Sequence, residues 1–342
     1  MSHVTIKDIA RLAGVSYTTV SRALNNTSEI SPETRERVLA ICRQEGYRAN
    51  LLARGLSSHH TNLIGLIIPD ISSPYFSELY LNIETYAMDL GYQVILCNGQ
   101  PGDGKIEELL EFLIGRRVDG IILVSSINNA HELFSRYSQT VPTVLLGDCA
   151  TQETNPANIV SVDNILGGRM AAEYLYRLGH REVLYLGLRR ESIIQTRRYR
   201  GFADAALELG LAVRVVENPE PGSTINAGYR LAKQVFLEGF AGTAAFAAAD
   251  AVAMGAMQAA DEFGISIPGQ LSILGFDNIS YSALPNIRLT TLDQQKKQQA
   301  EATMDLLLDL IRHPDSGRFT RRLIPPVLLE RSSCSRAEPP VP

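Results

Sequence analysis

The first 46 residues repeat apolar positions with the period of an α-helix. Between residues 6 and 13, apolar side chains recur at three- and four-residue spacing, which predicts a helix with one apolar face. Thr5 and Asp8 have the spacing of a capping box, and Gly14 suits the left-handed position that ends a helix. A short capped helix is therefore expected at the start of the chain.

Two further helices are expected after short turns. Ser16 is a suitable N-cap for a helix whose inner side holds Val20 and Leu24, and Ser31-Pro32 begins a third helix that reaches Gly46. Three short helices with a tight turn between the first two match the helix-turn-helix pattern. An ordinary helical subdomain has the same spacing, but its outer faces more often hold Glu and Lys than an aromatic, hydroxyls and an arginine.

From residue 62 the pattern changes to buried strands that alternate with helices. Short apolar runs such as LIGLII, DGIILV and LSILGF are typical of parallel strands covered on both faces. Helices are expected between the strands, over residues 75–90, 104–115, 130–138, 166–179, 195–209, 226–238 and 250–263. This alternation predicts two doubly wound α/β units of about 100 residues each.

Composition narrows the class of protein. The chain has 342 residues, 45% hydrophobic and 20% charged, which is typical of a globular protein with several domains. No apolar run reaches membrane-spanning length and the N-terminus lacks a signal pattern, so no membrane contact and a cytoplasmic location are expected. The four cysteines are scattered, which predicts reduced thiols and no metal site. Phosphate-loop, zinc-protease and nucleophile-elbow motifs are missing, so neither an enzyme nor a cofactor is expected.

Charge is distributed unevenly along the chain. Residues 1–60 hold eight Lys and Arg against five Asp and Glu, a net charge of +3. Because the whole chain has a net charge of −5, the remainder carries −5 − 3 = −8. The basic excess lies only in the helical segment, as expected if that segment alone contacts DNA phosphates.

Long motifs give the chain a family resemblance. The segments VTIKDIARLAGVSYTTVSRALN and SPETRERVLAICRQEGYRANLLARGL, followed in order by IGLIIPDISSPYF, SVDNILGG, YLYRLGHREVLYLG and LSILGFDNIS, resemble the lactose/galactose repressor family of bacterial transcriptional regulators. The resemblance covers nearly the whole chain. It implies a small all-α helix-turn-helix domain, then a two-lobed α/β body with two doubly wound parallel sheets, like a periplasmic sugar-binding protein. It also implies a homodimer.

The expected domains follow from the patterns and the resemblance together. They are a helix-turn-helix domain over 1–46, a linker with a hinge helix over 47–61, an effector-binding and dimerisation domain over 62–332, and a flexible tail over 333–342. Within the body, lobe one is expected over about 62–160 and 292–320, and lobe two over about 161–291 and 321–332. The tail has no heptad pattern, so a dimer rather than a helical tetramer is expected.

The second helix is expected to enter the major groove of double-stranded operator DNA. Tyr17, Thr18 and Arg22 are expected at base edges, with Arg22 suited to guanine. Hydroxyl and amide side chains nearby are expected at phosphates: Thr5, Ser16, Thr19, Ser21, Asn25 and Ser31. The resemblance implies that the linker helix wedges Leu56 into the minor groove, with Ala53 one turn earlier. Without the resemblance, a flexible tether is the favoured interpretation of the linker.

A second set of polar residues follows the strands of the body. In open α/β sheets, ligands lie beyond the carboxyl ends of the strands. The expected effector residues are Asp70, Ser73, Phe76, Asp148, Arg198, Asp250 and Asp277. Their forked hydrogen-bonding groups and aromatic ring suit a sugar or sugar derivative. Asp70 and Asp250 are equally suited to capping the next helix, and Arg197 to a solvated charge.

Two function classes remain from the sequence. The first is a transcriptional regulator, in the sense of a repressor, that binds a pseudo-palindromic operator as a dimer under the control of a small polar effector. The second is a cytoplasmic sugar-binding receptor that does not regulate transcription directly. The basic N-terminal helices favour the first. An inducer is expected rather than a corepressor, because the polar set suits a sugar.

Overall fold

The chain consists of two compact units, Met1–Thr61 and Asn62–Pro342. The computed structural model describes residues 4–24, 30–47, 60–99, 105–125, 129–148, 156–314 and 317–337. Within these residues, no helix combines the length and the apolar character needed to cross a membrane.

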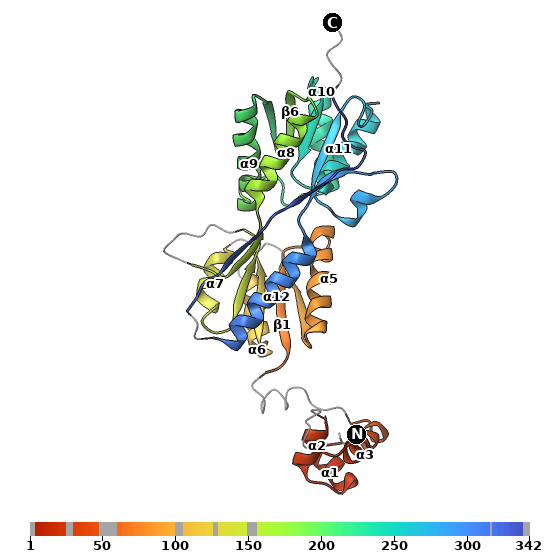
Figure 1. Cartoon of the computed structure of the whole chain (residues 1–342), viewed down its shortest axis with the longest axis vertical. Helices are drawn as coiled ribbons and strands as arrows, with labels where there is room; N and C mark the ends of the chain where they lie inside the picture. The colour runs from red at the N-terminus through yellow and green to blue at the C-terminus, as the bar shows by residue number, and fades with distance from the viewer. Residues whose placement is uncertain are drawn as a thin grey trace. The chain divides into compact units, whose positions relative to one another are not determined.

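The first unit is a bundle of three short helices, as the sequence predicts (Figure 1). They are α1 (Ile6–Ala13), α2 (Tyr17–Leu24) and α3 (Pro32–Gln44). The capping box is formed, because the Thr5 amide donates to Asp8 Oδ2 at 3.0 Å and the Asp8 amide donates to Thr5 Oγ1 at 3.4 Å. Gly14 ends α1 with φ of 65°, the left-handed conformation that favours glycine.

One residue from each helix forms the centre of this unit. Ile9, Val20 and Val38 are fully buried together, which fixes the angle between α1 and α2. The opposite side of α2 is exposed, with Tyr17 at 60%. The core therefore determines which side of α2 faces outward.

The first lobe of the second unit is built on a parallel six-stranded sheet with the order β11-β5-β4-β3-β1-β2. Its strands are β1 (Leu63–Ile68), β2 (Gln93–Asn98), β3 (Gly120–Val124), β4 (Thr143–Leu146), β5 (Ile159–Val162) and β11 (Arg321–Ile324). Helices α5 (Pro74–Asp89) and α12 (Lys296–Arg312) pack in one apolar cluster on this sheet, and α6 (Lys105–Gly115) and α7 (Ala130–Tyr137) pack in the other. We call this assembly lobe one.

The second lobe repeats this plan with the strand order β12-β10-β9-β8-β6-β7, in which only the β10–β12 pair is antiparallel. Its strands are β6 (Glu182–Leu188), β7 (Ala212–Glu217), β8 (Ala244–Ala247), β9 (Ser272–Asp277), β10 (Thr290–Asp293) and β12 (Val327–Leu329). Its helices are α8 (Asn164–Arg177), α9 (Ile193–Leu209), α10 (Ile225–Leu237), α11 (Asp250–Glu262) and the 3₁₀ helix η1 (Ser280–Ala283). We call this assembly lobe two; both doubly wound sheets confirm the predicted fold class.

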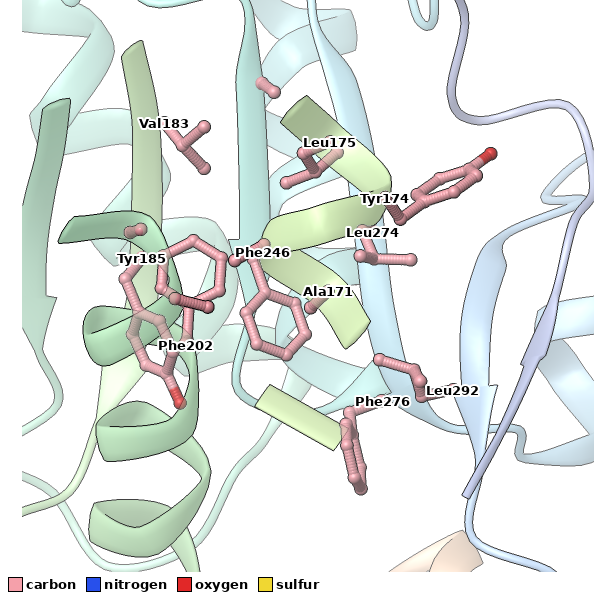
Figure 2. Close-up of a cluster of buried hydrophobic side chains, with 14 of the residues drawn as sticks. Ala171, Tyr174, Leu175, Val183, Tyr185, Phe202, Phe246, Leu274, Phe276 and Leu292 are labelled. Atoms are coloured by element: carbon pink, nitrogen blue, oxygen red, sulfur yellow. The ribbon is translucent and has the colours of Figure 1, made fainter. Parts of the chain in front are cut away.

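Aromatic side chains fill the core of lobe two between its sheet and helices α8 and α9. Tyr185, Phe202, Phe246 and Phe276 are all fully buried, and Figure 2 shows them gathered on this side of the sheet. Tyr185 meets Phe202 edge to face with ring centroids 5.5 Å apart. Its hydroxyl has no hydrogen-bond partner among the described residues. Burying this unsatisfied group lowers the free energy of unfolding, although the rest of the cluster is apolar.

The chain crosses between the lobes three times, and each crossing lies a few residues after its expected boundary. The crossings occur between β5 and α8, between β10 and α12, and between β11 and β12. Residues 161–162, expected in lobe two, belong to β5 of lobe one. Residues 321–329 form two short strands separated at Pro325-Pro326, because proline cannot donate to a strand ladder. As a result residues 321–324 pair with β5 in lobe one, not in lobe two, and residues 292–293 belong to lobe two. Figure 1 shows this dark-blue segment passing between the lobes.

Two other segments depart from expectation. The sequence pattern gave no separate strand at β5, which is only four residues long and fully buried. Residues 333–337, expected in the tail, are hydrogen-bonded to lobe two: the Ile273 amide donates to the Ser333 carbonyl at 2.8 Å and the Ala337 amide to the Leu178 carbonyl at 2.8 Å. These bonds connect distant residues, which a local pattern cannot reveal.

Candidate functional site

Helix α2 presents a polar face suited to a DNA groove. Tyr17, Thr18 and Arg22 are exposed, and they share the side opposite Val20 and Ala23 in the core. The tyrosine hydroxyl on this face can donate and accept hydrogen bonds, and the longer arginine side chain carries a forked set of donors. The three residues expected at base edges therefore lie where a ligand can reach them.

Several hydroxyls expected at phosphates also hold the helices in shape. Thr5 Oγ1 donates to Asp8 Oδ2 at 2.6 Å within the capping box. Ser16 Oγ accepts the Thr19 amide at 3.1 Å and lies 2.6 Å from Thr18 Oγ1 and 2.8 Å from Thr19 Oγ1. Ser31 Oγ accepts the Thr34 amide at 3.3 Å and caps α3. Capping thus accounts for these hydroxyls without DNA, and each retains acceptor lone pairs.

Four of the expected DNA residues remain. Ser21 is half-buried on α2. Asn25, Ala53 and Leu56 lie outside the described residues.

Polar side chains meet at the junction of the two lobes, where strands of both sheets end. Asp148 directly follows β4 in lobe one and is 3% exposed. Its Oδ1 receives Arg197 from α9 of lobe two and Arg321 from β11 of lobe one, the latter at 2.8 Å. Burial raises the pKa of Asp148, and the two guanidinium groups act against that rise. Arg197 is therefore not a solvated charge but a cross-lobe partner of Asp148.

Arg198 lies on the neighbouring face of α9 and is almost completely enclosed, with 3% exposed. Its Nε and Nη2 donate to Asn164 Oδ1 at 3.2 and 2.9 Å, and its Nη1 donates to the Ala248 carbonyl. Its guanidinium carbon stacks 3.4 Å from the centroid of the Phe276 ring. Burial lowers the pKa of Arg198, while Asp277 is the largest of the opposing influences. The side chain is held rigidly in an orientation set by three separate elements.

Asp250 and Asp277 form a buried acidic pair. Asp250 accepts the Ile279 amide at 3.0 Å and the Thr291 hydroxyl at 2.5 Å, and Asp277 accepts Gln294 Nε2 at 2.5 Å. Burial raises the pKa of both carboxyls, and in Asp250 the neighbouring Asp277 charge adds to the rise. Asp250 therefore fastens the chain after β9 rather than capping its own helix.

The backbone at the end of β9 is strained. Asp277 has φ of 129° and Asn278 has φ of 51°, conformations that non-glycine residues rarely adopt. Their carbonyls accept Lys296 Nζ at 2.8 and 2.7 Å, and Lys296 also pairs with Glu78 of α5. Glu78 in turn accepts the Ser280 amide of lobe two at 2.7 Å. Strain of this kind persists where surrounding contacts over-determine the backbone, as they do here.

At the start of α5, Tyr75 rather than Phe76 is bonded to the polar network at the junction. The Tyr75 hydroxyl donates to Gln294 Oε1 at 3.1 Å, and burial raises its pKa. Phe76 stands edge-on to Tyr75, with centroids 5.2 Å apart. Asp70 and Ser73 bond within their own turn: Asp70 Oδ1 accepts the Ser72 amide at 2.9 Å, and the Ser73 carbonyl accepts the Ser77 amide at 3.0 Å.

The structure thus brings together only part of the expected effector set. Asp148, Arg198, Asp250 and Asp277 belong to one connected region, which we call the junction cluster. Sequence reasoning missed its supporting members, which are Asn164, Lys296, Gln294, Glu78 and Arg321. Asn164 and Gln294 lie within two residues of a strand end, a signal that could have identified them. The other three carry no local signal.

A separate pocket lies away from the junction cluster. It has a volume of about 510 Å³ and is lined by β7, the loop after it and the middle of α10, including Arg214, Glu217 and Arg230. Its arginines pair with exposed carboxylates, Arg214 with Glu238 and Arg230 with Glu220. No expected site residue lines it, so it does not define the effector site.

Metal chemistry finds no support in the part of the chain that the structure describes. No group of three or more His, Cys, Asp or Glu side chains there is arranged to hold a metal ion. Cys42, Cys97 and Cys334 are free thiols, and burial raises the pKa of each.

Two family models match this chain. The model described as "Bacterial regulatory proteins, lacI family" matches residues 5–50, and "Periplasmic binding protein-like domain" matches residues 172–334. The HTH-type transcriptional repressor PurR of Haemophilus influenzae (strain PittEE) is 33% identical over 334 residues, covering 96% of this chain and 98% of that protein.

Solved structures agree with the sequence matches. The lac repressor dimer bound to operator and the anti-inducer ONPF matches with a TM-score of 0.86 and 27% identity, covering 98% of this chain and all of that one. A LacI family transcriptional regulator from Enterococcus faecium with bound ribose matches with a TM-score of 0.68 and 28% identity, covering 81% of this chain and 100% of that one. A DNA-binding transcriptional regulator rather than an enzyme is thereby established, and the chain belongs to the lacI family of bacterial regulatory proteins.

Proposed function

We propose that this protein represses transcription in the cytoplasm as a homodimer whose affinity for a pseudo-palindromic operator is set by a small polar effector. The observation that carries the proposal is the junction cluster, a preorganised polar site at the strand ends of two lobes, in a chain that begins with an exposed helix-turn-helix face. The dimeric, operator-bound state of the lac repressor supports the same arrangement here.

At the operator, α2 enters the major groove. Tyr17, Thr18 and Arg22 read base edges, and Thr5, Ser16, Thr19, Ser21, Asn25 and Ser31 contact phosphates. Leu56, with Ala53, wedges into the minor groove at the centre of the site. The net charge of +3 on residues 1–60 favours binding, while the charge of −8 on the remainder keeps the body off the duplex.

At the junction, the effector binds to Arg198 and Asp277. Bonds to Asn164 and Ala248 account for three of the five N–H groups of the Arg198 guanidinium within the described residues, which leaves two for ligand oxygens. Asp277 supplies acceptor oxygens. The ring of Phe76, which lies against Tyr75 outside the junction cluster, supplies an apolar surface. A neutral molecule with several hydroxyls, such as a sugar or sugar derivative, fits this set, and the ribose-bound relative supports that class.

The effector acts as an inducer in this proposal. It changes the closure of the lobes, which alters the geometry of the two DNA-binding units in the dimer. Effector affinity and operator affinity are then linked reciprocally.

The test has two stages. Selection of bound DNA from a random pool by the purified full chain should return a pseudo-palindromic sequence. A panel of neutral sugars, phosphorylated sugars and nucleobases is then scored for release or tightening of that DNA. Recovery of no common sequence would refute operator binding, and a panel hit confined to nucleobases would refute the sugar class.

A further inference from the structure

The buried carboxylate of Asp148 is one of the contacts that join the two lobes, beside the Glu78–Ser280 bond described above. It stands at the end of β4 in lobe one, and its backbone carbonyl is fixed by the Ser125 hydroxyl at 2.8 Å. Arg197 reaches Oδ1 from lobe two, and Arg321 reaches the same oxygen from lobe one. One acceptor atom is thus shared between a partner in the other lobe and a partner in its own lobe.

The two arginines differ in what happens to them when the lobes separate. Arg197 belongs to α9 and moves with lobe two. Arg321 belongs to β11, which pairs with β5 in the same sheet as β4, so it stays beside Asp148. Because a buried carboxylate without a partner is costly, Arg321 makes the separated arrangement attainable.

The shared carboxylate is also next to the effector site. Asn164 lies at the crossing from β5 to α8, where its Oδ1 accepts two bonds from Arg198. The Asn164 side chain is also among the groups that favour the ionised form of Asp148. A short path of contacts therefore joins Asp148 to Arg198.

We propose that Arg197 is a latch that stabilises the closed arrangement of the lobes, and that Arg321 is a fixed counter-ion that permits the latch to open. Asp148 acts in this device rather than as a direct effector contact. An effect of the latch on operator affinity rests on the function proposed above. The effect of the latch on lobe closure does not.

The latch predicts that substituting the two arginines changes the population of the open arrangement in opposite directions. Arg197→Gln removes the cross-lobe partner, so the open arrangement becomes more populated. Arg321→Gln leaves Arg197 as the cation that contacts Asp148 among the described residues. Opening then leaves the Asp148 charge uncompensated, so the closed arrangement becomes more populated. If the two arginines had only a structural role, both substitutions would shift the closed-to-open ratio in the same direction, or would leave it unchanged.

The experiment measures lobe closure in the full chain. Spin labels are attached through unnatural amino acids at Glu108 of α6 and Asp261 of α11, both exposed, and labelled chains are diluted into unlabelled ones. Distance distributions are recorded for the parent, Arg197→Gln, Arg321→Gln and the control Arg200→Gln. Arg200 is an exposed residue of α9 that pairs with Asp204 of the same helix. The closed-to-open ratio should change by about fivefold or more, in opposite directions for the two test variants.

The same two substitutions in an Asp148→Asn chain test whether their effects depend on the Asp148 charge. In an Asp148→Asn chain neither arginine substitution should change the ratio, because the charge they share is gone. Shifts in the same direction, or no difference from Arg200→Gln, would overturn the latch. If the closed-to-open ratio shifts as expected while operator affinity stays constant, the latch is supported and the proposed coupling to DNA is refuted. If the ratio stays constant while the effector still controls operator affinity, the latch is refuted and the proposed function stands.

Discussion

At the scale of single residues, the polar groups of this protein are used in two different ways. On α2, Tyr17 and Arg22 are held outward by a core on the other side of the helix. At the junction cluster, Arg198 and Asp277 are buried and fixed by neighbours before any ligand arrives. The first arrangement suits reading a surface, and the second suits enclosing a small molecule.

Arg22 provides a test of base reading. Replacing Arg22 by Ala should weaken binding to the selected operator by about 1–3 kcal/mol and relax the preference at one base position, because a forked donor pair is lost. Arg43→Ala on α3, also exposed, is the control and should weaken all sequences slightly and equally. Binding isotherms on the operator and its single-base variants decide the matter; equal loss on every variant would contradict base reading by Arg22.

Asp250 provides a test of the buried acidic pair. Burial and the Asp277 charge raise the pKa of Asp250 to about 7. The folded chain therefore holds this proton more tightly than the unfolded chain, whose aspartates titrate near pH 3.9. The associated stability is fully present below that value and is lost as pH rises through the folded pKa.

Asp250→Asn removes this titration. The free energy of unfolding of the variant should fall less than that of the parent between about pH 4 and pH 7, by on the order of 1 kcal/mol or more. Denaturant unfolding at several pH values measures the difference, with the exposed Asp204→Asn as control. Parallel curves for parent and variant would show that the pair does not titrate in this window.

At the scale of elements, glycines set how closely the helices of lobe two pack. A Cβ atom on Gly168 of α8 would overlap the Arg198 carbonyl of α9, and one on Gly201 of α9 would overlap the Ile165 carbonyl of α8. The two helices therefore meet backbone to backbone. This contact places Arg198 beside Asn164, so helix packing and the proposed effector site depend on the same glycines.

Gly168→Ala should force α8 and α9 apart. Overpacking of this kind typically costs about 1–3 kcal/mol of stability, and here it should also weaken effector binding by displacing Arg198. Gly115→Ala at the end of α6 is the matched control, because no atom lies within 4 Å of its added Cβ and helix propensity favours alanine. Calorimetric melting of both variants tests this, and equal melting temperatures would show that the helices can separate freely.

At the scale of the whole molecule, the DNA-binding unit and the two-lobed unit have opposite charge and separate cores. The body can therefore change its closure without unfolding the helices that touch DNA. Three crossings link the lobes, and one of them contains Pro325-Pro326, which restricts its backbone. Lobe motion is thereby confined to a few linking residues, as in hinge closure.

Asp277 tests whether the two units have separable functions. Asp277→Asn should weaken binding of the effector found in the metabolite panel by roughly tenfold or more, because a charged hydrogen-bond acceptor is lost. Operator affinity without effector should remain unchanged, and Asn suits the left-handed backbone here. Calorimetry with the effector and operator titrations without it measure the two functions, with exposed Asp261→Asn as control. A variant that binds effector normally would remove Asp277 from the site.

The sequence by itself determined the helix-turn-helix, the repeated strand–helix alternation and the family, because these depend on local periodicity, capping and short motifs. It also singled out Arg198 and Asp277 as candidate effector residues, a prediction that effector-binding measurements have to test. Only the tertiary structure decided that Arg197 pairs with Asp148, that Tyr75 rather than Phe76 bonds to Gln294, and that β11 belongs to lobe one. Those contacts join residues far apart in the chain, and their partners are chosen by burial and packing rather than by any neighbouring residue.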